Sequence, residues 1–306
     1  MQKAVPNYYH KFTCIADRCR HSCCIGWEID IDEKTMAMYQ TMALPIGEDI
    51  RNSIEGDEPH FKLQSGDRCP FLKDNGLCRI ICECGKDALC DICRLHPRFR
   101  NFYSSFVETG LGLCCEEAAR IILFDNEPFS VLLPQKVELT EEEQLFFSLR
   151  EQIFEKLKDR TKSIEKRFLM LKERYRISFD FSLRETCEYF LSLERLEESW
   201  TKRLLHLKEY KFDESVFKDS EFSVLFENLA VYFVFRHLSD GLWDGLYAER
   251  LRLAFVSCYL IGAFVSQIKD EKGVLEDEDI IDIVRQYSSE IEYSEENIFA
   301  LLKNQF

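Results

Sequence analysis

The stretch "LTEEEQLFFSLREQIFEKLKDR" at residues 139–160 predicts that the second part of this chain is helical. Thr140 and Glu143 have the spacing of a capping box, which marks the start of a helix. Apolar residues then recur with helical spacing, at Phe146, Phe147, Leu149, Ile153, Phe154 and Leu157. We therefore expect an amphipathic helix here.

The same pattern continues to the end of the sequence. Ser182 and Glu185 repeat the capping spacing in the segment 181–196, and no proline follows Pro134, which suits long helices. Further helices are predicted at 163–176, 197–209, 221–238, 244–268, 277–290 and 295–304. We predict an all-helical region at 138–306, without excluding that it packs as one body with what precedes it.

The region 1–137 has a different character, because twelve of the fourteen cysteines lie at or before Cys115. In "CPFLKDNGLCRI" (69–80), Asn75-Gly76 between apolar runs predicts a type I′ hairpin that would bring Cys69 and Cys78 together. Short helices are expected after Asp32 and at 116–124. The predicted fold class is mainly α, with a cysteine-rich loop and hairpin metal-binding region followed by a helical bundle-like half.

Composition limits the function classes. The net charge is −15, so the surface repels phosphate backbones and we expect no nucleic-acid partner. The N-terminal stretch lacks the apolar core of a signal peptide, and the most apolar run, 253–265, is too short to span a bilayer. We therefore expect a cytoplasmic protein with no membrane partner.

Three uses compete for the dense cysteines of "CIADRCRHSCC" (14–24) and the segments after it. A disulfide framework needs an oxidising compartment, which the expected location does not offer. Inert buried thiols are common singly, as we expect for Cys187 and Cys258 in their apolar helical contexts. Metal or iron–sulfur ligation suits the remaining density best, because neighbouring thiolates can converge on one soft metal centre.

The spacing matches neither a zinc ribbon nor a ferredoxin, and it lacks the CxxxCxxC motif of radical SAM enzymes. The ordered set "CIADRCRHSCC", "CPFLKDNGLC", "CRLHPR" and "CCEEAAR" instead resembles the flagellin lysine N-methylase family, within a wider set of zinc- or iron-chelating cysteine-cluster proteins. The stretch 239–261 is also similar to the helical half of these methylases, so the resemblance extends from about residue 8 to 265.

The resemblance implies methyl transfer from S-adenosylmethionine to lysines of flagellin, and a [4Fe–4S] cluster held by cysteines. The positions that match the family's motifs are Cys14, Cys19, Cys23, Cys24, Cys69, Cys78, Cys93 and Cys114. Outside the pattern stand Cys82, Cys84, Cys90 and Cys115. One cluster needs four thiolates, so two metal sites, or one site with further structural cysteines, both stay open.

Catalytic and donor-binding residues are less clearly marked. Glu116, Glu117 and Tyr103 are candidates to deprotonate the lysine, against an ordinary role at the surface or at a helix start. His96 is a candidate metal ligand or neighbour of one, against an ordinary loop histidine.

The basic residues Arg94, Arg98 and Arg100 are candidates to hold a cluster or a carboxylate, against ordinary surface arginines. The stretch "GLGLCC" (110–115) lacks the third glycine of a nucleotide-binding loop, so S-adenosylmethionine would need another device, such as an open iron of the cluster. The alternative function is a non-catalytic zinc- or iron-chelating module.

Overall fold

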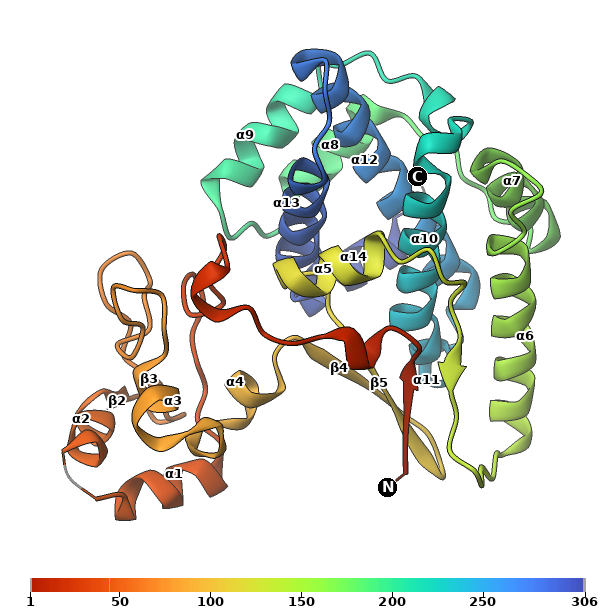
Figure 1. The fold of residues 1–306 in the computed structure, drawn as a ribbon. Coiled ribbons are helices and arrows are strands. Elements are labelled where there is room, and N and C mark those ends of the chain that lie inside the picture. Colours follow the sequence, from red (N-terminus) through yellow and green to blue (C-terminus); the bar gives the residue numbers. More distant parts are fainter. Residues whose placement is uncertain (1, 44, 305–306) are drawn as a thin grey trace. The chain divides into compact units, whose positions relative to one another are not determined.

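The computed structural model describes residues 2–43 and 45–304, which divide into two compact units. We call Met1–Phe12 with Phe99–Phe306 the helical unit, and Thr13–Arg98 the cysteine unit. The predicted boundary at 137/138 falls inside the helical unit, because the sheet and the helix around residues 98–132 pack with the later helices. The units are described separately (Figure 1).

The prediction of a mainly α-helical chain is confirmed, and every helix expected after residue 138 is present. Short 3-10 turns lie at Tyr9–Lys11, Glu214–Phe217, Ser220–Phe222 and Leu238–Asp240, and a π-helical turn at Ser288–Glu292. The helices of this unit are α5 (Glu116–Leu123), α6 (Glu141–Leu157), α7 (Ile164–Arg174), α8 (Leu183–Ser192), α9 (Glu198–Leu207), α10 (Ser223–His237), α11 (Gly241–Asp244), α12 (Tyr247–Lys272), α13 (Asp277–Tyr287) and α14 (Glu295–Lys303).

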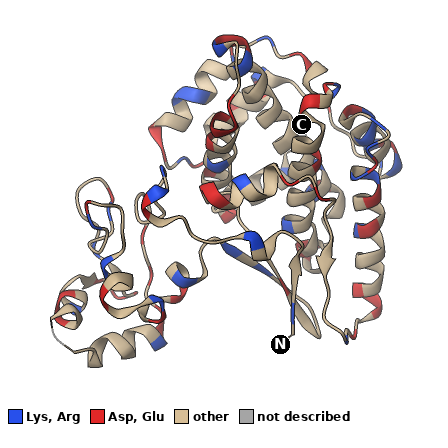
Figure 2. Cartoon of the chain, viewed as in Figure 1, with Lys and Arg blue, Asp and Glu red and all other residues tan. Residues whose placement is uncertain are grey.

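Local capping fixes where the helices begin. At α6 both halves of the predicted capping box form, with the Glu143 amide donating to the Thr140 hydroxyl and the Thr140 amide to the Glu143 carboxylate. Acidic residues cluster at that N-terminal end of α6, where their negative charge interacts favourably with the positive end of the helix dipole (Figure 2). At α8 the Ser182 hydroxyl accepts from the amide of Glu185, as expected.

The core of the helical unit is built around α10 and α12. Nearly every residue of α10 is buried, and so is most of α12 from Arg250 to Gln267. Among the described residues, α12 alone is long and apolar enough to cross a bilayer, yet 83% of its most apolar window is buried inside the protein. Its place in the core accounts for its composition.

A small sheet adds the N-terminal residues to this unit. Its strands are β1 (Gln2–Pro6), β4 (Arg98–Phe102), β5 (Phe106–Leu111) and β6 (Val131–Leu132), in the order β4-β5-β1-β6. Strand β1 pairs in parallel with β5, with Gln2 opposite Phe106, and antiparallel with β6. This pairing joins residues about a hundred positions apart and was not foreseen from local pattern.

The cysteine unit is assembled from short pieces. It contains 3-10 turns at Ala16–Arg18 and Lys86–Ala88, helices α1 (Glu33–Thr41), α2 (Ile46–Asn52), α3 (Arg79–Cys84) and α4 (Asp91–Leu95), and strands β2 (Ile54–Glu55) and β3 (His60–Phe61). The helix expected after Asp32 forms as α1, and the Asp32 carboxylate caps it by accepting from the amide of Thr35. Its small core includes Tyr39, Phe61 and Phe71 together with buried Cys69 and Cys90.

The predicted hairpin between Cys69 and Cys78 forms, but its turn type was wrong. Type I′ needs positive φ at both central residues, and only Gly76 has it, at +79°. The Gly76 amide donates to the carbonyl of Lys73 and the Lys73 amide to the carbonyl of Leu77. The connection is therefore a three-residue loop that ends in a left-handed glycine.

Candidate functional site

Five thiols gather in the core of the cysteine unit. Cys24 and Cys69 lie on paired backbone segments, since the Cys69 amide donates to the Cys24 carbonyl at 2.9 Å. Cys78 immediately precedes α3, and Cys90 and Cys93 lie at the start of α4. Cys69 and Cys90 are buried in the unit's apolar cluster, and Cys24, Cys78 and Cys93 pack against it, as Cys84 also does. The five thiols named first affect one another's pKa, so segments far apart in sequence bring them near one another.

Electrostatic coupling among these thiols shows how close they are. Burial raises the pKa of Cys69 to about 12, and nearby thiolates at Cys24, Cys78 and Cys90 add to the rise. A hydrogen bond with Cys90, together with burial, raises the pKa of Cys93, while the same hydrogen bond lowers that of Cys90. Each thiolate therefore disfavours the next unless a cation compensates their charge.

Cys24 is the most acidic thiol of the group. A hydrogen bond with Cys23, outweighing burial, lowers its pKa to about 7, and Ser22 and Arg68 help to lower it. A thiol that ionises near neutral pH is ready to bind a soft metal. Across the described residues, however, no three His, Cys, Asp or Glu side chains are arranged to hold a metal ion. The five thiols lie near one another, but their sulfur atoms are not arranged around a common metal position.

The other predicted ligands are not part of the five-thiol group, although Cys23 is hydrogen-bonded to Cys24 of that group. Cys14 and Cys23 are exposed, and half-buried Cys19 donates from Sγ to the carbonyl of His21 at 3.2 Å. Cys114 belongs to the helical unit, where burial raises its pKa to about 12.

Cys90, which lies outside the motif pattern, belongs to the gathered group, whereas Cys82 is exposed. Cys84 also packs against the same apolar cluster. The C-x2-C spacing of Cys90 and Cys93 at a helix start was the signal that could have found Cys90.

The imidazole ring of His96 has one nitrogen that no described protein group binds. Its Nε2 is buried and has no hydrogen-bond partner among the described residues. Burial, and then the Arg98 guanidinium, lower the pKa of His96 to about 4, so the ring is neutral at physiological pH. A neutral imidazole with an unused nitrogen can accept a proton donor or bind a metal.

The three candidate bases are buried in the helical unit, and two of them, Tyr103 and Glu117, are bound to other protein side chains. Tyr103 is 5% exposed, packs on Phe106 and Phe147, and donates to Glu108, which is itself bound to Arg150. A residue so enclosed does not reach a protein substrate in this structure. Glu117 is buried at the start of α5 and pairs with Arg120. Glu116 is also buried there, so neither is a solvated surface group, but both lie in the first turn of α5, which confirms the competing interpretation of acidic residues at a helix start.

Two of the three basic residues near "CRLHPR" have protein partners. Arg94 pairs with Asp91 at the start of α4, which explains it without a ligand. Arg98 donates to the carbonyl of His96 at 3.2 Å. Arg100 instead lines a large cavity of the helical unit.

The loop "GLGLCC" does follow a strand, β5, and precede a helix, α5. It cannot cradle a nucleotide, because protein atoms already fill it. A Cβ at Gly110 would lie 2.2 Å from the Phe99 ring, and the Leu113 amide is taken by the Tyr232 hydroxyl at 3.2 Å. The expectation that this loop is not a donor-binding loop agrees with its packing.

The large cavity was not anticipated from the sequence. It has a volume of about 780 Å³ and lies entirely within the helical unit. At its inner side the buried Glu292 carboxylate contacts His237 and Arg236. Its lining consists of Phe99, Arg100, Asn101, Arg236, His237, Asp240, Asp244, Arg250, Glu292, Glu295, Glu296, Ile298, Phe299 and Leu302.

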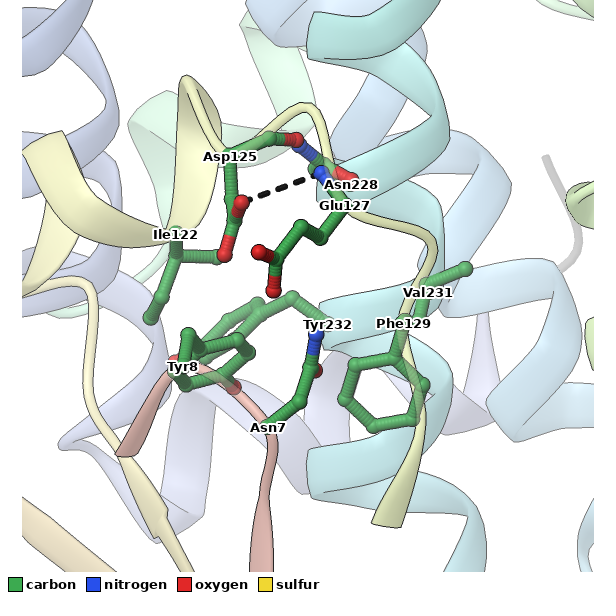
Figure 3. A pocket seen from close by; sticks show the side chains of 9 residues that line it. All are labelled: Asn7, Tyr8, Ile122, Asp125, Glu127, Phe129, Asn228, Val231 and Tyr232. Carbon is green, nitrogen blue, oxygen red and sulfur yellow. Dashed lines mark hydrogen bonds between the residues drawn. The ribbon is translucent and has the colours of Figure 1, made fainter. Parts of the chain in front are cut away.

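A second cavity in the same unit is far smaller, about 10 Å³, which is at the limit of one water molecule. Tyr8 and Asn7 close it from the N-terminal segment, opposite Tyr232 and Asn228 of α10 (Figure 3). The Tyr8 hydroxyl is buried there without a hydrogen-bond partner among the described residues. Its size suits a structural water and no substrate.

A family model matches most of the helical unit. The family model for the FliB lysine N-methylase C-terminal domain matches residues 111–306, a range that includes Cys114 and none of the other predicted ligands. The chain is similar, at 32% identity over 139 residues, to the lysine-N-methylase of Salmonella typhimurium and to that of Salmonella choleraesuis. Each match covers 43% of this chain and 34% of the relative, so the chain spans about a third of their length.

The flagellar biosynthetic protein FliU of Salmonella muenchen is 30% identical over 139 residues, which are 43% of this chain and 81% of that protein. No solved structure matches the chain.

Proposed function

The chain belongs to the FliB lysine N-methylase family, and from that membership we propose that it transfers methyl groups from S-adenosylmethionine to lysine side chains of flagellin. The observation that carries the proposal is the family match over 111–306, nearly the whole helical unit after its sheet. A relative described as a flagellar biosynthetic protein supports flagellin as the substrate. The reaction would take place in the cytoplasm, before flagellin is exported.

We further propose that the cysteine unit holds an iron–sulfur cluster, [4Fe–4S] in type. The donors fit such a group by their chemistry, because thiolates of the five-thiol group raise the pKa of Cys69 and Cys93, and an iron–sulfur core would compensate the charge of these thiolates. The side chains are, however, not arranged around one point in this structure. Cys24, Cys69, Cys78, Cys90 and Cys93 are the nearest candidates to hold it. The remaining motif positions, Cys14, Cys19, Cys23 and Cys114, stay predicted ligands or neighbours of the site.

When bound, a cluster with an open iron would supply a place for the amino and carboxylate groups of S-adenosylmethionine. The chain's own residues shape the surroundings. Trp27 and His96 lie with ring centroids 6.2 Å apart in this unit, and Nε2 of the neutral His96 ring is buried without a hydrogen-bond partner among the described residues. Tyr39, fully buried, donates its hydroxyl to the Ala88 carbonyl and so fixes the loop that leads to Cys90.

The experiment is methylation of the host's flagellin by anaerobically purified full-length protein with methyl-labelled S-adenosylmethionine. We expect labelled methyl-lysine, together with a brown protein whose iron and acid-labile sulfide are present in cluster stoichiometry. Absence of labelled lysine with an intact cluster would overturn the proposed activity.

A second function, a zinc- or iron-chelating module without catalysis, is favoured by the packed "GLGLCC" loop, which leaves no recognisable nucleotide loop there. A colourless, zinc-loaded protein that never methylates flagellin would support this alternative.

A further inference from the structure

The large cavity of the helical unit contains a buried acid–base pair. The Glu292 carboxylate, whose side chain is 1% exposed, lies 2.7 Å from Nε2 of His237. It also contacts Arg236 Nε at 3.2 Å and accepts from the Tyr232 hydroxyl at 3.0 Å. Both His237 and Glu292 line the cavity, so the pair lies where a ligand would meet it.

The backbone that carries Glu292 is unusual. Glu292 is the last residue of the π-helical turn Ser288–Glu292, which lies between α13 and α14. π-helical turns make up well under 1% of residues in proteins, and they occur frequently at functional sites. The structure keeps this turn and at its end presents a buried carboxylate to the cavity.

The protonation state of the pair follows from its surroundings. Burial would raise the pKa of Glu292, but Arg236 and His237 outweigh it and leave that pKa below its usual value. Burial lowers the pKa of His237 despite Glu292, so the ring is neutral. An ionised carboxylate only accepts hydrogen bonds, so the ring proton lies on Nε2 and Nδ1 keeps its lone pair.

The charges of the cavity select for a cation. Its lining carries five carboxylates and three guanidiniums, so it is net acidic. Arg250 is bound to both Asp240 and Asp244, and Arg236 to Glu292, which leaves the exposed acids Glu295 and Glu296 on α14 against Arg100. This surplus of carboxylates favours an ammonium group over an anion.

Two exposed apolar side chains lie on elements that also carry lining residues of this cavity. Phe299, which lines the cavity, is 54% exposed. Trp243 is 80% exposed and lies in the chain between Asp240 and Asp244, two residues of the lining. Exposed tryptophans beside a cavity are typical anchors of protein partners rather than of free small molecules.

We propose that this cavity receives the lysine side chain of the protein substrate, with Trp243 and Phe299 anchoring the flanking polypeptide and His237 accepting the ammonium proton. The inference rests on the proposed function and adds to it the place and the base. An N–H bond of the ammonium breaks, its proton moves to His237, and the electron pair stays on the lysine nitrogen. Glu292 stabilises the imidazolium that forms, as a positioning residue.

The test uses the full-length protein, its cluster intact, with the host's flagellin. Trp243→Ala is expected to raise KM for flagellin by about tenfold or more, as loss of an interface anchor does. Glu296→Gln is expected to raise it by about two- to fivefold, as loss of one exposed charge does. Both side chains are exposed, so both variants should fold.

His237→Gln is expected to lower kcat by about a hundredfold or more while KM for flagellin changes little, because a base acts on the chemical step. A merely structural histidine would lower kcat only in proportion to the folded fraction. Matched controls are Leu145→Ala on α6, which is 73% exposed, and Glu278→Gln in the first turn of α13. Both controls should keep the wild-type constants.

Binding is read without catalysis from tryptophan emission. Trp200 is fully buried, Trp27 is half-buried in the cysteine unit and Trp243 is exposed. Flagellin should therefore shift the emission of wild type to shorter wavelength, and the shift that Trp243 contributes should be lost in Trp243→Phe.

If wild type methylates flagellin and the Trp243 and Glu296 variants match the controls, the cavity inference is overturned while the function stands. If these variants lose affinity for S-adenosylmethionine and keep that for flagellin, the cavity is a donor site and the inference is also overturned. If wild type binds flagellin through Trp243 but transfers no methyl group, the proposed function fails and the binding site stands.

Discussion

The two units of this chain differ in what holds them together. The helical unit buries large side chains such as Trp200, Phe168 and Phe226 in one extended core. The cysteine unit has as its longest helix the nine-residue α1, and its core is a small cluster that includes buried Cys69 and Cys90. Apolar burial suffices for the first unit, whereas the second should depend on what its thiols bind.

Metal removal should have the largest effect on the difference in stability between the two units. Treating the protein with a chelator under reducing conditions should abolish amide-exchange protection throughout 13–98 and leave that of α10 and α12 unchanged. The reason is that the free energy of metal binding is part of the folding free energy of a small metal-held unit. Hydrogen exchange followed by mass spectrometry measures both regions at once. Equal protection of 13–98 before and after chelation would refute the contrast.

Cysteine substitutions should affect metal content and activity in the cysteine unit but only stability in the helical unit. Cys93→Ser and Cys23→Ser are expected to lose metal and flagellin methylation together, since a hydroxyl suits a soft metal poorly. Cys258→Ser is the matched control within α12, where the thiol is fully buried in apolar surroundings. It should keep metal and activity and cost about 1–3 kcal/mol of unfolding free energy. Full metal content in both ligand variants would show that these two cysteines are not ligands.

Glu108→Gln tests the helical unit where it depends on charge rather than apolar burial. Both Arg150 hydrogen bonds to Glu108, at 2.6 and 2.7 Å, are buried, and the substitution leaves the Arg150 charge uncompensated. We expect a loss of about 3–5 kcal/mol in urea unfolding. The control is Glu209→Gln, whose pair with Arg184 is exposed and should contribute less than about 1 kcal/mol. Equal losses would mean that burial of the pair does not matter.

The smallest expected effect is at the start of α6. Thr140→Ala removes the cap and should cost about 1 kcal/mol. Although burial opposes it, hydrogen bonds from Ser104 and Thr140 hold the pKa of Glu143 below its usual value. The contribution of ionised Glu143 to the free energy of unfolding is therefore fully present above the pKa of about 4.3 that it has in the unfolded chain. That contribution is lost as the pH falls through the lower pKa of Glu143 in the folded protein. Thermal melts at pH 7 and pH 3 should show a smaller Thr140→Ala effect in acid.

Local signals in the sequence predicted the helix starts well. The structure confirms the capping box predicted at Thr140, one half of the capping box predicted at Ser182, and the helix predicted after Asp32. Such signals act within three residues, so they are visible in the sequence. The hairpin at Asn75-Gly76 was placed correctly, but its turn type was wrong because one glycine at φ +79° sufficed. The pairing of β1 with β5 had no local signature, since its partners are far apart in the chain.

The sequence by itself determined the helical class, the density of thiols and the family resemblance, because periodicity, spacing and motif order are properties of neighbouring residues. Only the tertiary structure decided that Cys90 joins Cys24, Cys69, Cys78 and Cys93. Likewise, only packing joins His237 to Glu292 at the edge of a cavity, 55 residues apart in the chain. Such sites depend on which distant segments share a core, and burial then sets the charge of the groups that meet there.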